Sequence, residues 1–135
     1  MIKSIDAGGI KVNVAEATAE NQFELYGMIS ARILHQCAAT MTEDVNADLV
    51  KGILMSSEKG FTSDVAEIVL YKAFIANTET KVSLGDFQGK IDAYYSLIAE
   101  AVCLNLADFF ISVKSQVSLM KANMQKAQAE KDERL

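Results

Sequence analysis

Few residues of this chain have the types and spacing that catalysis requires. The single histidine, His35, lies late in a segment with helical apolar spacing, and no pattern of an acid and a nucleophile surrounds it. Nucleophilic catalysis needs a base within hydrogen-bond reach of the nucleophile and a third group that orients the base. Cys37 follows His35 by two residues, which on a helix places the two side chains on roughly opposite sides. We therefore expect no catalytic residues and no enzyme activity.

Metal and phosphate sites are not indicated either. A zinc site needs several ligands at fixed spacing. The acidic residues Glu43, Asp44 and Asp48 gather where a helix is expected to begin, and the helix dipole explains acids there. The segment Ala7-Gly8-Gly9 has neither the GxGxxG nor the GxxxxGKS/T phosphate-binding pattern. We expect no metal and no cofactor.

Composition and charge define the broad class of the protein. The chain has 135 residues, of which 50% are hydrophobic, carries a net charge of −5 and contains no proline. This length and composition predict a single domain with a real core, and the lack of proline favours a mainly helical one. The acidic balance argues against nucleic acid as a partner, because phosphates need a basic surface.

Targeting and redox signals are few. No apolar run reaches the ~18 to 20 residues of a membrane span, and the first residues lack the apolar core of a signal peptide. We therefore expect a soluble, intracellular protein with no membrane partner. Cys37 and Cys103 lie among apolar neighbours, which predicts buried free thiols.

The predicted elements form a compact helical domain of four to five helices with a short N-terminal β-hairpin. Two short runs, 2–6 and 10–14, flank the Gly8-Gly9 turn and predict the hairpin, within about residues 1–15. Thr18 is expected to cap a first helix, whose apolar face comprises Phe23, Tyr26, Ile29 or Ser30, Ile33 and Cys37. A second helix follows Thr42, and a third runs from Asp64 to Ile75. The single domain spans 1–124, and 125–135 is a polar C-terminal tail.

One unbroken apolar stripe runs through the last third of the chain. Its spacing of four, three and four residues is an 11-residue period of about 3.67 residues per turn, which keeps the side chains on one helix face. A helix of this length would measure roughly 50 Å, more than the ~37 Å diameter of a compact chain of this size. The helix must therefore break, for which the weak helix formers Ser112 to Ser118 are candidates, or project beyond the domain. The stripe consists of Ile91, Tyr95, Ile98, Val102, Leu106, Phe109, Val113, Val117, Met120 and Met124.

The two ends of the stripe differ in their surroundings. Between Tyr94 and Ile111 apolar residues cover most of the helix circumference, which predicts a central buried helix. Beyond Ile111 only the stripe remains, so the domain is expected not to cover it completely. We predict a partner-binding surface there, formed by Val113, Val117, Met120 and Met124.

In its overall arrangement the chain resembles the tail assembly chaperones of long-tailed, lambda-like bacteriophages. The resemblance rests on three features. The first is the N-terminal motif Gly9-Ile10-Lys11-Val12-Asn13-Val14 followed by Ala17-Thr18-Ala19, and the second is the small, proline-poor helical body. The third is the stretch that begins with Asp86-Phe87-Gln88-Gly89-Lys90, ends with Asn105-Leu106-Ala107-Asp108-Phe109-Phe110 and precedes a polar tail.

The resemblance implies a non-enzymatic role in the host cell cytoplasm. Members of this family bind the long, hydrophobic tape measure protein and keep it soluble while tail tube protein assembles around it, and a homo-oligomer is expected. Many exist in a second, longer form made by ribosomal frameshifting. Two alternatives stay open: a helical adaptor or regulatory subunit that binds a partner through the C-terminal helix, and a small-molecule-binding domain with a pocket among Phe87, Tyr94, Tyr95, Phe109 and Phe110.

Overall fold

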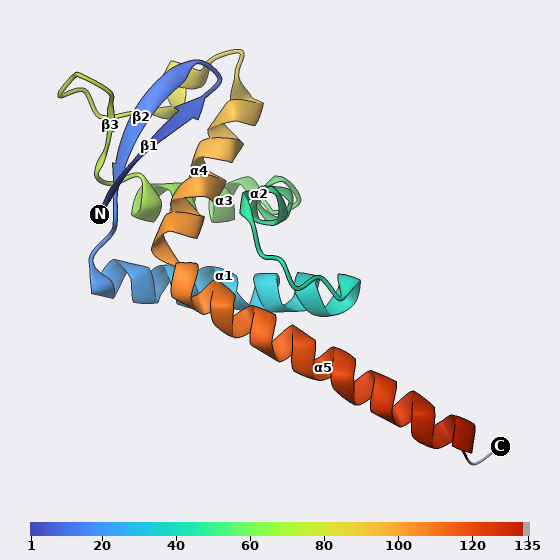
Figure 1. Cartoon of the computed structure of the whole chain (residues 1–135). Helices are drawn as coiled ribbons and strands as arrows, with labels where there is room; N and C mark the ends of the chain where they lie inside the picture. Colours follow the sequence, from blue (N-terminus) through green and yellow to red (C-terminus); the bar gives the residue numbers. More distant parts are fainter. Residues whose placement is uncertain (134–135) are drawn as a thin grey trace.

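The computed structural model describes residues 1–133 and confirms a mainly α-helical domain with an N-terminal β-hairpin (Figure 1). Five α-helices and a small sheet make up the described part of the chain. In chain order the elements are β1 (Ile2–Ala7), β2 (Ile10–Ala15), α1 (Ala19–Thr40), α2 (Ala47–Met55), α3 (Lys59–Val69), β3 (Ala73–Ile75), the 3-10 helix η1 (Leu84–Phe87), α4 (Ile91–Asn105) and α5 (Ala107–Glu133).

The hairpin turns at the two glycines, as predicted. Gly8 and Gly9 both have positive φ, 61° and 88°, which glycine adopts without steric cost, and the Gly9 N–H donates to the Asp6 carboxylate at 3.0 Å. The turn also packs tightly on the start of α4. A Cβ on Gly8 would lie 2.8 Å from the Cβ of Ala93, and the Lys90 ammonium donates to the Gly8 carbonyl at 2.9 Å. The hairpin is thus braced by α4.

A third strand was not predicted. The sheet has the order β1-β2-β3 and is antiparallel throughout, with Val12 opposite Ile75 and Val14 opposite Ala73. The predicted third helix, Asp64 to Ile75, is therefore wrong at both ends, since α3 begins at Lys59 and ends at Val69. The residues that follow α3 bond to β2 instead, a pairing with a segment about 60 residues earlier in the chain that local pattern does not reveal.

Helix α4 is the centre of the core, as its all-round apolar pattern predicted. It contacts α2, α3, η1 and β1, and apart from the partly exposed Glu100 its residues from Leu97 to Val102 are inaccessible to solvent. The fully buried side chains of α4 are Leu97, Ile98, Ala99, Ala101 and Val102.

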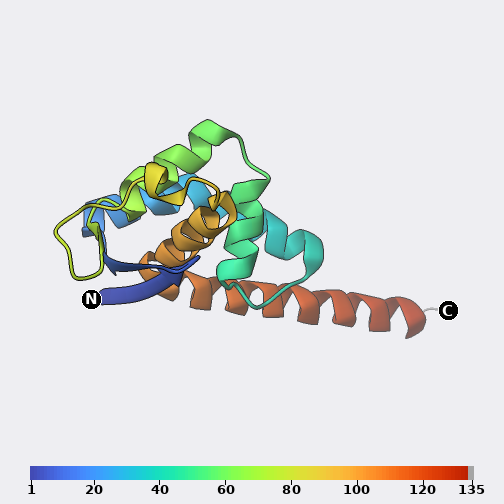
Figure 2. The ribbon, with the colours of Figure 1, turned by 90° about the horizontal axis from the view of Figure 1, so that it is seen from above.

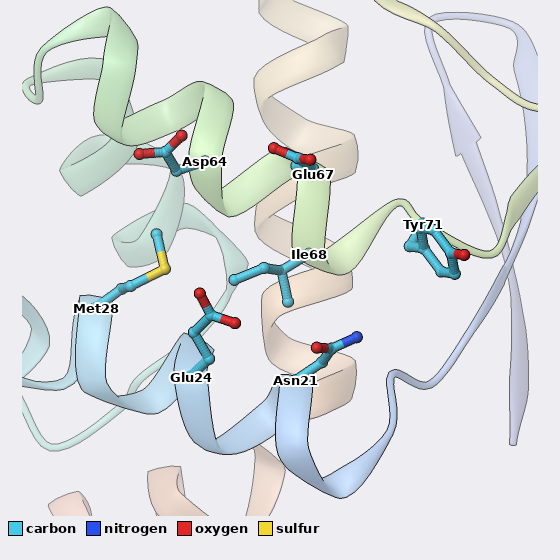
Figure 3. A pocket seen from close by; sticks show the side chains of 7 residues that line it. All are labelled: Asn21, Glu24, Met28, Asp64, Glu67, Ile68 and Tyr71. Carbon is cyan, nitrogen blue, oxygen red and sulfur yellow. The ribbon is translucent and has the colours of Figure 1, made fainter.

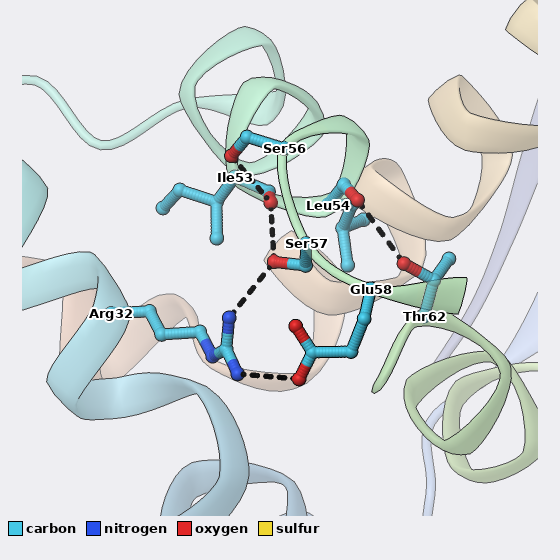
Figure 4. Close-up of polar contacts among 7 residues, drawn as sticks. All are labelled: Arg32, Ile53, Leu54, Ser56, Ser57, Glu58 and Thr62. Atoms are coloured by element: carbon cyan, nitrogen blue, oxygen red, sulfur yellow. Dashed lines mark hydrogen bonds and ion pairs between the residues drawn. The ribbon is translucent and has the colours of Figure 1, made fainter. Parts of the chain in front are cut away.

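The turn between α2 and α3 is tied to α1 by polar contacts (Figure 4). The hydroxyl of Ser57 donates to the Ile53 carbonyl at 2.7 Å and accepts from the Arg32 guanidinium at 3.0 Å. Arg32 also pairs with Glu58 at 3.4 Å and lies 3.9 Å from the centre of the Phe61 ring. These contacts fix where α3 begins, five residues before the predicted Asp64 start.

The apolar stripe crosses a sharp bend. The helices α4 and α5 meet at an angle of 83°, with Leu106 as the one residue between them. The break therefore lies before the Ser112 to Ser118 segment, which is helical throughout. After the bend, α5 runs past α1 and extends beyond all other elements in both views (Figures 1 and 2). The segment 125–133, expected as part of a polar tail, continues this helix, while 134–135 lie outside the described residues.

Candidate functional site

The predicted partner-binding residues divide into two pairs. Val113 and Val117 are 0% and 1% exposed and belong to the hydrophobic core, so the expectation that the domain leaves them uncovered is wrong. Met120 and Met124 are 38% and 61% exposed. The predicted apolar surface of α5 thus begins about two turns later than expected, at Met120 instead of Val113, because the bend lays the first half of α5 against the body.

Further apolar side chains of α5 are exposed beside the two methionines. Leu119 is 62% exposed, and Ile111, at the start of the helix, is 71% exposed. Beyond Lys121 every residue of α5 whose side chain is described is exposed. Exposed leucine and methionine on a projecting helix form an adaptable apolar surface, because methionine is flexible and polarizable.

A hollow of about 450 Å³ lies where α5 leaves the bend and passes the start of α1. Phe109 contacts Tyr26 edge-to-face, with ring centres 4.9 Å apart, and Phe23 on the same side of α1 is 79% exposed. Sequence reasoning placed Phe23 and Tyr26 on the buried face of the first helix, which is wrong. The predicted residues Ile29, Ile33 and Cys37 are buried, and Leu25 completes the buried face of α1 in place of Phe23 and Tyr26.

Phe23 and Tyr26 were not identified from the sequence as surface residues. The four-residue spacing of Leu25, Ile29, Ile33 and Cys37 could have shown this, because these residues already form a complete buried face. We take the exposed part of α5 (Leu119, Met120 and Met124) together with the aromatic hollow (Phe23, Tyr26 and Phe109) as the candidate binding surface.

The body holds α5 with a small set of contacts. Besides the two buried valines, Lys114 pairs with Asp44 at 3.9 Å and Lys121 with Glu43 at 3.3 Å. Both acids lie in the segment between α1 and α2, and all four side chains are partly or largely exposed. Such surface pairs contribute little free energy each, so the two buried valines, together with Phe109 and Phe110 packed against the core, carry most of the attachment.

A buried asparagine with three hydrogen bonds lies at the bend. Asn105 is 5% exposed, and its side-chain oxygen accepts from the Ala17 N–H at 2.8 Å and from the Gln22 side chain at 3.1 Å. Its side-chain nitrogen donates to the Ala101 carbonyl at 2.8 Å. Asn105 therefore fixes the end of α4 against the start of α1, where α5 begins.

The aromatic pocket proposed for a small molecule is divided in the structure. Phe87 and Tyr94 contact each other near η1, with ring centres 5.3 Å apart, and burial raises the pKa of Tyr94. Phe109 and Phe110 lie together on α5, on the far side of the bend. Tyr94 and Phe109 line separate hollows, so these aromatic side chains do not enclose one ligand.

A second hollow, of about 500 Å³, lies between α1 and α3 (Figure 3). Glu24 of α1 and Asp64 and Glu67 of α3 line it, with Met28 and Ile68 between the helices. Within residues 1–133, no group of three or more histidine, cysteine or carboxylate side chains is arranged to hold a metal ion.

The candidate catalytic side chains are scattered. His35 is exposed on α1, whereas Cys37 is buried two residues later, and burial raises the pKa of its thiol. Cys103 is partly buried on α4, and burial together with the nearby Glu100 carboxylate raises its pKa to about 11, although Lys3 opposes this. Both thiols are therefore protonated at neutral pH and are weak nucleophiles.

Taken one at a time, the helices described here lack the length and apolar content of a membrane span, and α4 with α5 meets these criteria only when the bent pair is counted together.

Comparison of the chain with protein-family models, with curated proteins and with solved structures finds no match.

Proposed function

We propose that this chain is a bacteriophage tail assembly chaperone, which binds the tape measure protein and keeps it soluble while tail tube protein assembles around it. The observation that carries the proposal is the projecting half of α5, where Leu119, Met120 and Met124 are exposed and the helix extends beyond the other elements. The sequence resemblance supplies the client, and the geometry supplies a surface of the kind such a client requires.

The surface suits a long, helical, hydrophobic client. A client helix can lie along the exposed apolar residues of α5, in the manner of a helix packed in a groove. The aromatic hollow at Phe23, Tyr26 and Phe109, nearer the bend, offers a second apolar site along the same helix. The net charge of −5 disfavours aggregation of free copies. We propose no catalytic step.

Co-expression with the tape measure protein encoded by the same phage tests the proposal. In the double variant Leu119→Glu with Met124→Glu, we expect the tape measure protein to move from the soluble to the insoluble fraction, because both charges enter the contact surface. The matched control is Ser115→Glu, an exposed polar position of the same helix.

Two results would contradict the proposal. One is a tape measure protein that is equally soluble with and without the chain. The other is a double variant that retains full client solubility. If the chain instead binds a different, single partner through the same α5 residues and leaves the tape measure protein insoluble, the adaptor alternative replaces the chaperone.

A further inference from the structure

The bend between α4 and α5 is held by side-chain contacts: Asn105 bonds to Ala17 and Gln22, and the Asp108 carboxylate accepts from the Phe109 N–H at 2.8 Å. Residues 91–133 contain neither glycine nor proline, the residues that usually interrupt a helix. Leu106, a good helix former, is the one residue outside the two helices, with φ −120° and ψ 26°. The apolar stripe keeps its period through the bend, from Val102 over Leu106 to Phe109. No residue of this segment forbids a continuous helix over 91–133, about 65 Å long at ~1.5 Å per residue, although Asn105 and Asp108 are weak helix formers.

The surface of the body that holds α5 in its bent position is the same in every copy of the chain, so α5 of one copy can bind the body of another. Val113 and Val117 pack into the core beside α1, and Lys114 and Lys121 pair with the segment between α1 and α2. If α5 of one copy swings out by straightening at Leu106, the α1 surface that it leaves is complementary to α5 of another copy. The exchanged dimer makes the same contacts between α5 and the body as the bent single chain. The free energy of straightening the chain at Leu106 is therefore the main difference between these two forms.

We propose that α5 exchanges between two copies of this chain, with α4 and α5 joined in one continuous helix and Val113 and Val117 of each copy packed against α1 of the other. This is domain swapping through a hinge of one residue. The proposal concerns self-association alone and does not rest on the client proposed above.

A proline at the first position of α5 distinguishes the two forms. Ala107 is the first residue of that helix, where the backbone N–H has no partner within α5, so proline removes no hydrogen bond of the bent form. Proline there still strains Leu106, whose ψ of 26° is not the extended value that a residue before proline prefers, but this strain is smaller than the clash within a continuous helix. In a continuous helix the same proline would remove a hydrogen bond and collide with the carbonyl four residues earlier. We expect the full-length wild-type chain to form a dimer in light scattering after size-exclusion chromatography, and Ala107→Pro to be a folded monomer with an at least tenfold lower dimer fraction. Ala107→Ser, which keeps the N–H, should behave as wild type.

A mixing experiment tests the exchange independently of that variant. One chain carries Lys114→Glu with Lys121→Glu, and the other carries Glu43→Lys with Asp44→Lys. Exchange in the mixed dimer restores attractive pairs on both sides, whereas each chain alone retains like charges. We expect native mass spectrometry of the co-refolded chains to show the mixed dimer enriched about fivefold over statistical mixing, a modest factor because the pairs are on the surface.

Several results would overturn the proposal. A wild-type chain that is monomeric at all concentrations would do so, as would a folded Ala107→Pro variant with an unchanged dimer fraction. If Ala107→Pro does not fold, the mixing experiment decides: enrichment supports the exchange, and a statistical mixture contradicts it, because a dimer formed through other surfaces leaves the ion pairs within each copy.

Discussion

Helices α4 and α5 carry two halves of one apolar stripe, yet the fold uses them in different ways. The stripe residues Ile98 and Val102 of α4 are fully buried, and so are Leu97, Ala99 and Ala101 on other faces of the helix. In α5 the stripe is buried at Val113 and Val117 and then passes into solvent at Met120 and Met124. Periodicity alone therefore identifies a helix face but not its partner, and the residues on the remaining faces decide whether the helix is central or peripheral.

The largest expected effect contrasts one leucine from each helix. Leu97 of α4 is completely buried, and Leu97→Ala should lower the free energy of unfolding by about 3 kcal/mol through lost burial and a cavity. Leu119 of α5 is 62% exposed, and Leu119→Ala should change it by less than about 0.5 kcal/mol. Urea-induced unfolding of both variants measures the difference, and equal losses would show that α5 is part of the core along its full length.

A second contrast lies within α5. Val117→Asp places a charge in the core and should cost about 2 kcal/mol, less than the several kcal/mol of a fully trapped charge, because α5 can detach from α1. Met124→Asp, one turn beyond the last contact with the body, should leave the unfolding midpoint unchanged. Thermal unfolding followed by circular dichroism compares them. A Val117→Asp variant as stable as wild type would mean that α5 is not packed on the body.

The support of α4 by the hairpin can be tested at the two turn glycines. Both have positive φ, but only Gly8 would bring a new Cβ against Ala93, so Gly8→Ala should lose about 1 kcal/mol more stability than Gly9→Ala. Denaturant titration of the two variants gives this difference. Equal losses would indicate that the turn does not press on α4.

The smallest expected effect concerns Cys103, near the end of α4. Its pKa is raised to about 11, so in alkali the thiol of the unfolded chain ionises first. The folded and the unfolded chain both keep the thiol proton below about pH 8. The free energy of unfolding therefore falls as the pH rises through 9 toward 11, where only the unfolded chain loses this proton readily. Over this pH range the free energy of unfolding should decline more for the wild type than for Cys103→Ala. An equal pH dependence of the two proteins would mean that the thiol is open to water.

Local sequence signals predicted much of the fold. The Gly8-Gly9 turn and the Thr18 cap lie where their turn and capping chemistry places them, because both act within a few residues. The β3 strand and the bend at Leu106 depend on partners distant in sequence, namely β2 and the contacts of α5 with the body. Of the candidate surface, the exposed Met120 and Met124 were named from the sequence, whereas the exposed Phe23 required knowing that Leu25 takes the inward position in the first turns of α1.

Hydrogen–deuterium exchange of the full-length chain, with and without the tape measure protein, tests the central claim most directly. We predict strong protection of α4 in both samples. Without the client, residues 122–133 should exchange rapidly, and the client should add protection over 118–128 without changing α4. Protection of the free α5 end as strong as that of α4, or client-induced protection confined to other elements, would contradict the assignment of α5 as the binding helix.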